Sequence, residues 1–408
     1  MNVPATDDLA VLRKERFIVI ILAAIQVAHI LDFVIMMPLG PQFMRVFNIS
    51  PVEFSTLVSA YTFSAGIVGF FGALYADHFD RKKFLLFNFS GFIIGTFMCA
   101  ISPNFGALLA ARIIAGAFGG VLNASVLSLV SDLIPYQRRG AAMGVVMSAF
   151  SISSILGVPT GLFIANAFDW HGAFYFICIV GLIFWIAAYF VLPSVKIKTE
   201  PRSFKSNLMN FKSILIQKDY IQAFTLTSTL GFGIFMIVPF ISTYIVRNVG
   251  MPEDKLPLIY LVGGIGTIIT ARIVGKLCDK IGSYAVFRVT AVISIVPILL
   301  LTNLPAAPLW IALIVTSLFT MFGSARFIPA MTLVSAVVKP EERGTFMSLE
   351  NASRQLSSGL ASQGAGLILG STAAGALTHY NVVGLVGVVT SIVAIFIALR
   401  IKNKFNLR

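Results

Sequence analysis

Charged residues are scarce in this sequence. Asp, Glu, Lys and Arg make up 12% of the 408 residues, about half of the ~25% found in ordinary soluble domains. Hydrophobic residues make up 57% of the chain, and 36 residues are Phe. A soluble globular protein is excluded, because it could not hide so much apolar surface from water. The composition therefore predicts that most of the chain spans a lipid bilayer.

Cysteine and histidine are also rare, with three and four residues respectively. Cys99, Cys178 and Cys278 lie in or beside apolar runs and form no CxxC pair, so we expect small core residues and neither a disulfide nor a metal site. The chain contains no HExxH, GxSxG or Walker sequence, which argues against a membrane enzyme and an ATP-driven pump. We expect a protein that is not an enzyme and needs no cofactor.

Apolar windows of about 20 residues, the length that a helix needs to cross ~30 Å of hydrocarbon, can be placed twelve times. The predicted spans are 17–40, 53–76, 84–102, 105–132, 140–165, 173–192, 221–246, 256–278, 284–303, 308–337, 343–371 and 379–400. The first window is too long for the core of a signal peptide. The pattern predicts an all-α integral membrane protein with twelve transmembrane helices.

One long polar segment divides the predicted spans into two groups of six. This segment, 193–220, is rich in Lys and Ser and is assigned as a cytoplasmic central loop. We accordingly assign an N-terminal six-helix bundle to 1–192 and a C-terminal six-helix bundle to 221–408.

An internal repeat supports the division into halves. The pattern Arg-Gly-Xaa-Xaa-Met begins at Arg139 and again at Arg343, and Asp77 after span 2 corresponds to Asp279 after span 8. Because six spans return the chain to the same side, the halves have the same orientation, as in parallel repeats related by an axis along the membrane normal.

Positive charges are concentrated on one side of the predicted spans. Termini and loops on that side hold 23 of the 30 Lys and Arg residues, whereas the opposite side holds Arg45, Arg247 and Lys255. The positive-inside rule makes the first side cytoplasmic, so we expect both termini in the cytoplasm and the protein in the inner membrane. The net charge of +13 reports this topology, and we expect no nucleic-acid partner.

Asp32 in span 1 is one of two acidic residues inside the predicted spans. A charge in hydrocarbon costs at least about 2.5 kcal/mol, so it is a candidate functional residue. The helical rise places Asp32 about 22 Å from the cytoplasmic start of its span and Arg112 about 10 Å from the outer start of span 4, so the two can pair. We predict a protonatable carboxylate beside a binding cavity. A static ion pair that orders helix packing is the alternative.

Gln26 and His29 precede Asp32 at helical spacings of three residues. This polar arc would be wasteful against lipid, so we assign Gln26 and His29 to the substrate cavity. For His29, a hydrogen-bonded structural histidine is an equally open interpretation.

Glu350 in span 11 is the second acidic residue within the spans. Arg354 lies one helical turn further on the same face, and Arg326 in span 10 lies at comparable depth. Two arginines beside one carboxylate leave one positive charge in excess, which could bind an anionic group of a substrate. We therefore assign Arg326 and Arg354 to the substrate cavity. The alternative is a satisfied structural cluster between neighbouring helices.

Span 5 contains an unusual group of small residues and a proline. Gly157, Pro159 and Gly161 lie within nine residues of Ser153. Small residues allow close helix contact, and a proline frees a backbone carbonyl. The pattern predicts a kinked, tightly packed helix.

With these residues in place, the chain resembles the major facilitator superfamily and, within it, the twelve-span drug and sugar efflux proton antiporters. The resemblance covers essentially the whole chain. The family's motif after span 2 is met by Ala73, Asp77, Arg81, Lys82 and Lys83, with departures at Ala73, His78 and Asp80. The resemblance implies a conformational latch between the halves, formed by Asp77 and Arg81 with Asp132, and by Asp279 in the second copy.

Three further elements are similar to motifs of these exporters. Arg112 begins an element that resembles the span 4 motif linked to proton coupling. The segment from Gly157 to Gly161 looks like the antiporter motif of span 5, and Asp32 with the following Met-Pro-Leu-Gly-Pro is similar to the span 1 motif.

The resemblance implies two six-helix bundles around a central cavity and transport by alternating access. We predict a secondary active transporter that exports a small molecule, a drug-like compound or a sugar, against inward proton flow. Asp32 would be the main protonation site and Glu350 the second. Expected partners are the substrate, protons and membrane lipid, with a functional monomer. The alternatives are proton-coupled uptake of an organic anion, favoured by the surplus arginine, and a non-transporting membrane sensor.

Overall fold

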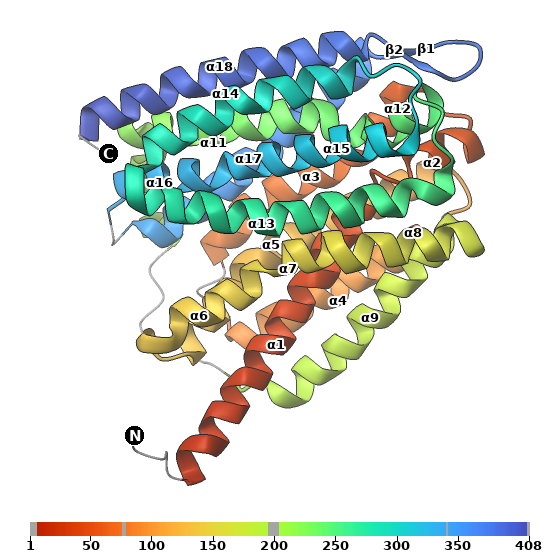
Figure 1. The fold of residues 1–408 in the computed structure, drawn as a ribbon. Helices are drawn as coiled ribbons and strands as arrows, with labels where there is room; N and C mark the ends of the chain where they lie inside the picture. Colours follow the sequence, from red (N-terminus) through yellow and green to blue (C-terminus); the bar gives the residue numbers. More distant parts are fainter. Residues whose placement is uncertain (1–5, 76–78, 195–203, 340–341, 406–408) are drawn as a thin grey trace.

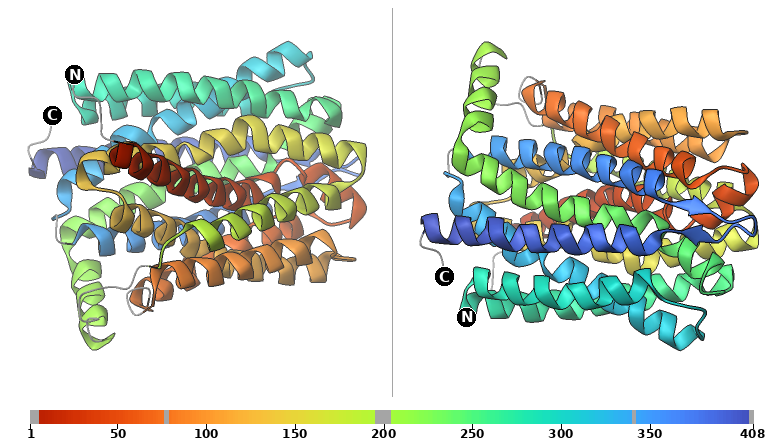
Figure 2. Two further views of the ribbon diagram at one scale, coloured as in Figure 1. Left: turned by 90° about the horizontal axis from the view of Figure 1, so that it is seen from below. Right: turned by 90° about the horizontal axis from the view of Figure 1, so that it is seen from above.

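The computed structural model describes residues 6–75, 79–194, 204–339 and 342–405. Long helices run side by side, and both ends of the chain lie at the same end of the bundle (Figures 1 and 2). We call this the terminal end, and the other the distal end.

The N-terminal half holds the first six spans. Its helices are α1 (Thr6–Ile35), α2 (Gly40–Val46), α3 (Pro51–Tyr75), α4 (Arg81–Ala100), α5 (Phe105–Leu133), α6 (Tyr136–Met147), α7 (Ala149–Ile152), η2 (Ser153–Gly157), α8 (Val158–Ala167) and α9 (Trp170–Val191). Side-chain caps begin several of them: Asp80 accepts from the backbone of Lys83, and Asn104 from that of Ala107. Such caps satisfy N–H groups that lack a partner in the first turn.

The C-terminal half holds the other six spans. Its elements are α10 (Phe204–Ile216), α11 (Lys218–Ile237), η3 (Val238–Phe240), α12 (Ile241–Arg247), η4 (Glu253–Lys255), α13 (Leu256–Ile281), α14 (Ser283–Thr302), α15 (Leu309–Ala325), α16 (Phe327–Val337), α17 (Arg343–Ile368), β1 (Gly370–Ser371), β2 (Leu377–Thr378) and α18 (Tyr380–Phe405). Several predicted spans are therefore built from two or more helical segments.

α17 differs from the other spans in composition. Among the described residues, eleven helical stretches are long and apolar enough to cross a membrane, and α17 is not one of them. It is nevertheless 26 residues long and packs between α3 and α11. A Cβ atom at Gly366 would lie 2.1 Å from Ser55 Oγ of α3, so the two backbones approach closely, as small residues permit in membrane helices. Burial among other helices explains why this span can be polar.

Two predicted boundaries need correction. The span predicted to reach residue 371 ends at Ile368, because the chain then forms a two-stranded antiparallel hairpin, β1 and β2. Gly375 supplies the positive φ of +79° near its turn, which glycine adopts without strain. The segment predicted as a polar loop contains α10, which lies across the direction of the spans (Figure 2), with Phe211 and Ile214 buried.

Three large apolar cores hold the described part of the bundle together. At the distal end a shared core joins both halves, with Leu31, Phe43, Phe54 and Trp170 from one half and Phe240, Leu301 and Tyr380 from the other. At the terminal end there are two cores. One contains Leu22, Phe89 and Val126 of the N-terminal half, and the other contains Tyr220, Phe287 and Leu333 of the C-terminal half. The halves therefore share one core at the distal end, whereas at the terminal end each half has its own core and only Phe70 of α3 packs against the core of the other half among the described residues.

The small residues of span 5 lie at a break in its helix. Ser153–Gly157 forms one wide π-helical turn before α8 begins, because Pro159 has no N–H to donate to the preceding turn. Gly157 packs against α1, where an added Cβ would lie 2.9 Å from Leu31 Cδ1. Gly157 therefore lies at a close contact between span 5 and α1. The same turn meets α13 of the other half, where Gly264 faces Ile155.

Candidate functional site

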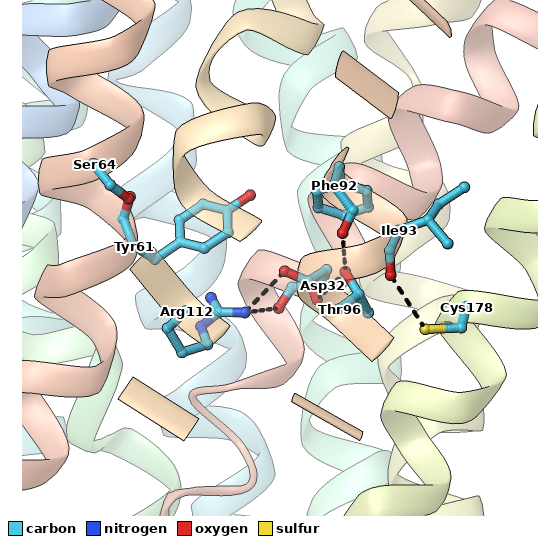
Figure 3. A network of polar contacts seen from close by, with 8 residues as sticks. All are labelled: Asp32, Tyr61, Ser64, Phe92, Ile93, Thr96, Arg112 and Cys178. Atoms are coloured by element: carbon cyan, nitrogen blue, oxygen red, sulfur yellow. Dashed lines mark hydrogen bonds and ion pairs between the residues drawn. The ribbon is translucent and has the colours of Figure 1, made fainter. Parts of the chain in front are cut away.

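A buried ion pair lies inside the N-terminal half. Arg112 Nη1 of α5 is 2.8 Å from Asp32 Oδ2 of α1, and both side chains are 0% exposed. Thr96 of α4 donates from its hydroxyl to Asp32 Oδ1 at 3.1 Å. Figure 3 shows the three side chains meeting from three helices. The pairing expected from helical depth is present.

Aromatic rings cover the other side of this pair. The Arg112 guanidinium lies over the ring of Tyr61 of α3, 4.3 Å from its centroid, and Phe33 of α1 stacks on Tyr61. A desolvated cation over an aromatic face gains about 2 kcal/mol. Phe33 also stacks on Phe235 of α11, so this aromatic stack runs from the pair to the C-terminal half.

Gln26 and His29 lie in the same helix face but are not at an open surface. They are 6% and 8% exposed. Gln26 Nε2 donates to Asn123 Oδ1 of α5 at 3.0 Å, and the edge of the His29 ring meets Phe92. In this conformation both residues belong to the interior of the N-terminal half, next to Asp32.

The sequence reasoning missed three residues of this site: Tyr61, Thr96 and Asn123. Thr96 and Asn123 are polar residues inside apolar spans, and that signal could have found them. Tyr61 carried no such signal, because an amphipathic aromatic residue is common in membrane helices.

Glu350 and Arg354 form the expected one-turn pair on α17. Arg354 Nε is 3.4 Å from Glu350 Oε1, and the two side chains are 36% and 4% exposed. Arg354 also donates to Asn351 Oδ1 at 2.9 Å. The Asp32–Arg112 pair is fully buried, whereas in this pair the Arg354 side chain is partly exposed.

Arg326, which the sequence analysis assigned with Arg354 to the substrate cavity, bonds to serines of α14 and α18. Its Nη1 donates to Ser391 of α18 at 2.6 Å and to Ser294 of α14 at 3.4 Å. The residue is 1% exposed and separates α15 from α16. The carbonyl end of α15 is a favourable place for a cation. Arg326 is therefore buried inside the C-terminal bundle.

The proposed latch is partly visible at the terminal end. Arg81 Nε at the start of α4 is 3.2 Å from Asp132 Oδ2 near the end of α5. Asp279 is exposed near the end of α13 and lines a surface hollow of about 900 Å³ together with Lys402. Asp77 lies outside the described residues. The Arg81–Asp132 pair joins two helices of the same half.

At the distal end an ion pair crosses between the halves. Arg45 of α2 bonds through two nitrogens to the carboxylate of Glu253 in η4. The pair lies at the rim of the shared core, beside the contact of α2 with α12. Polar and apolar contacts therefore join the halves at the same end.

No group of three or more His, Cys, Asp or Glu side chains among the described residues could hold a metal ion. The three cysteines are free thiols, and Cys99 and Cys178 are buried.

The sequence model of the Major Facilitator Superfamily matches residues 22–362 and, a second time, residues 224–406. This chain belongs to the major facilitator superfamily. It is therefore a multi-pass membrane transporter with the twelve-helix fold of that family. Its family consists of transporters and not of enzymes.

Curated relatives cover most of this transporter. The uncharacterized MFS-type transporter YceJ of Bacillus subtilis (strain 168) is 25% identical over 356 residues, which are 86% of this chain and 89% of that protein. Multidrug resistance protein 2 of the same organism is 24% identical over 325 residues, 78% of this chain and 80% of that protein.

Solved structures share the fold over nearly the whole length. A bacterial homolog of the human lysosomal transporter Spinster, in an inward-facing and unoccupied conformation, has a TM-score of 0.73 at 15% identity, covering 96% of this chain and 98% of that one. A D-xylose-proton symporter also has a TM-score of 0.73 at 17% identity, covering 93% and 96%. The prediction of two six-helix bundles is confirmed.

Proposed function

We propose that this protein is a proton-coupled secondary transporter of the inner membrane that exports a small molecule, a drug-like compound or a sugar. The buried pair of Asp32 and Arg112 is the observation that carries the proposal. The Asp32 carboxylate is 0% exposed and is held by one guanidinium and one hydroxyl. Its charge changes only when it binds or releases a proton, so it is suited to couple transport to proton flow. The names of the multidrug resistance relative and the xylose-proton symporter agree with both substrate classes.

The pair couples proton binding to movement through electrostatics. When Asp32 is ionised, its negative charge balances the positive charge of Arg112. The ion pair then stabilises the packing of α1, α4 and α5 around it. Protonation from outside removes the negative charge of Asp32. The buried Arg112 guanidinium then has no counter-ion, and a different arrangement of the helices becomes more favourable. A proton and a conformational state are thereby linked, as differential binding to two states requires.

The two ends of the molecule fit one state of an alternating-access cycle. The terminal end, which we place in the cytoplasm from the distribution of positive charge, has separate cores, whereas the distal end has a shared core and the Arg45–Glu253 pair. We assign this arrangement to a state closed toward the outside. Opening outward requires the halves to rock apart at the shared core.

Uptake of an organic anion receives less support. That alternative depended on a surplus arginine in the cavity, but Arg326 is buried against Ser294 and Ser391, and Arg354 is paired with Glu350. A sensor without transport activity finds no structural support in the described residues, whose helices are those of a transporter fold.

The test uses the full-length protein in proteoliposomes with a pH difference as the only driving force. Ethidium and D-xylose serve as probes, chosen after a thermal-shift screen that also includes organic acids. We expect accumulation of one probe by the unchanged protein and by the control Asp254→Asn, whose side chain is exposed on a distal loop. Asp32→Asn should abolish accumulation. Uphill transport by Asp32→Asn at the unchanged rate would overturn the assignment of Asp32.

A further inference from the structure

Several buried polar atoms beside the Asp32–Arg112 pair have no hydrogen-bond partner within the described part of the chain. They are both ring nitrogens of His29, the hydroxyl of Tyr61 and the side-chain oxygen of Gln26, together with Nε and Nη2 of Arg112. Native proteins rarely leave such atoms unsatisfied, and ordered water is their usual partner where the protein offers none.

The positions of these atoms suit bridging water. A Cβ atom at Gly119 of α5 would lie 2.5 Å from Tyr61 Oη and 3.1 Å from His29 Nε2. The phenol oxygen and the imidazole nitrogen therefore both pack against α5 at Gly119 and lie close to each other, yet neither has a hydrogen-bond partner in the described part of the chain. A single water molecule can hydrogen-bond two groups placed this close together.

The atoms also follow one direction through the half. Gln26, His29 and Asp32 are spaced by three residues on one face of α1, about 4.5 Å apart along the axis for each step. Asp32 is nearest the distal end of α1, and Gln26 is nearest the terminal end. Gln26 continues to Asn123 of α5 through its hydrogen bond.

We propose that water molecules bridge these unpartnered atoms and that His29 carries protons between Asp32 and the terminal end of the N-terminal half. This inference rests on the proposed proton-coupled function and assigns His29 to the proton path in place of the substrate cavity. It explains why both ring nitrogens of His29 are buried without a hydrogen-bond partner in the described part of the chain.

The proton steps balance at His29. A proton leaves the protonated Asp32 carboxyl for a water, which delivers it to Nε2 of the neutral imidazole. The imidazolium then releases a different proton from Nδ1 to a second water on the Gln26 side. Asp32 returns to its ion pair with Arg112, and His29 is left neutral with its proton on Nε2. Exchange of ring protons with water then returns the proton to Nδ1 before the next transfer.

The groups that face His29 are few. Asp32 lies on its own helix, Tyr61 on α3 and Arg112 on α5, while α4 contributes Phe92 and Thr96, which do not titrate. Cys99 lies near the pair in the same interior. Any pH dependence of the path therefore arises from Asp32 and His29 under the field of Arg112.

Nitrogen NMR tests the hydration of His29 without transport. The protein is labelled with ¹⁵N-histidine, which gives signals from four residues, and placed in nanodiscs of phosphatidylethanolamine and phosphatidylglycerol. The signal lost in His29→Gln identifies His29. We expect ring N–H protons that exchange with water and two tautomers in exchange. One fixed tautomer that stays protected in D₂O for hours would overturn the proposal.

Transport tests the relay with variants that keep Asp32 and Arg112. His29→Gln should lower the ratio of pH-driven accumulation of ethidium or D-xylose to probe exchange without a pH difference about 100-fold, as loss of a positioned proton-transfer group does. Gly119→Ala should act in the same way, because its added Cβ would lie 2.5 Å from Tyr61 Oη and must displace that hydroxyl from its place beside His29. Gly144→Ala, whose added Cβ meets nothing within 4 Å, is the matched control, and Tyr61→Phe replaces Gly119→Ala if that variant does not fold.

The outcomes separate the inference from the proposed function. Hydrated, exchanging His29 with unchanged pH-driven transport in His29→Gln would overturn the relay alone. Unchanged pH-driven transport in Asp32→Asn would overturn the proposed coupling as well. Loss of both driven transport and exchange in His29→Gln would contradict the relay, because it would indicate a structural histidine.

Discussion

Each half of this transporter buries one arginine, and the two are held differently. Arg112 in the N-terminal half is 0% exposed and pairs with the Asp32 carboxylate. Arg326 in the C-terminal half is 1% exposed and bonds to the hydroxyls of Ser391 and Ser294 at the end of α15. One cation faces a group that a proton can neutralise, whereas the other faces groups with a single charge state.

The difference assigns the halves different tasks. Binding a proton at Asp32 would leave Arg112 with neutral hydrogen-bond partners. Arg326 already has only neutral partners, the hydroxyls of Ser294 and Ser391. The surroundings of Arg112 can therefore alternate between two electrostatic states, whereas the serine hydroxyls around Arg326 keep one. The predictions below test this asymmetry by removing charges one at a time.

The largest effect on stability is expected where a charge is left alone. Arg112→Met leaves the Asp32 carboxylate buried without a cation and should lower the free energy of unfolding by about 3–5 kcal/mol. Arg326→Met leaves no opposite charge behind and should change it by less than about 1 kcal/mol. Denaturant titration in mixed micelles measures both. Asp32→Asn combined with Arg112→Met should recover most of the loss, and a failure to do so would mean that Arg112 acts mainly through Tyr61.

Coupled transport should follow the same asymmetry. Asp32→Asn should reduce pH-driven accumulation of the probe by at least about 100-fold, the scale of a lost proton-transfer group, whereas Arg326→Met should keep most of it. Glu350→Gln should have an intermediate effect, because Arg354 beside it is 36% exposed and water can replace the lost contact. Equal losses in Arg326→Met and Asp32→Asn, measured in the same proteoliposomes, would remove the distinction between the halves.

The ion pair at the terminal end should matter less. Asp132 is 36% exposed beside Arg81, so solvent screens the attraction, and Asp132→Asn should lower the unfolding free energy by no more than about 1 kcal/mol. Thermal melting in detergent gives this value. If Asp132→Asn lowered the unfolding free energy as much as Arg112→Met, the Arg81–Asp132 pair would not be screened by solvent.

The smallest effect is expected for Arg45 and Glu253 at the distal rim. The Arg45 side chain is 54% exposed, so Arg45→Gln should cost about 0.5 kcal/mol, and the cost should vanish in high salt. The exchanged pair Arg45→Glu with Glu253→Arg should restore it. The population of outward-open protein, followed by labelling of a cysteine introduced in α2, should rise slightly in Arg45→Gln. No salt dependence would contradict this description of the contact.

Much of the fold could be predicted because lipid restricts the choices. Apolar length identified the spans, and helical rise placed Asp32 and Arg112 at one depth, where the structure pairs them. Short elements escaped prediction: α10 and the β1–β2 hairpin lie outside hydrocarbon, where many backbone conformations are satisfied by water. Tyr61, Thr96 and Asn123 were missed because their roles depend on which helices become neighbours.

By itself, the sequence determined the number of spans, the repeat and the presence of a few costly charges, since hydrophobicity and helical rise act locally. Only the tertiary structure decided what each charge faces. Arg326 and Arg354 lie at similar depth along the sequence, yet one turns into its own bundle toward Ser294 and Ser391 while the other pairs with Glu350. Depth is a property of one helix, but a partner is a property of packing, because rotation about the helix axis is settled by the neighbouring helices.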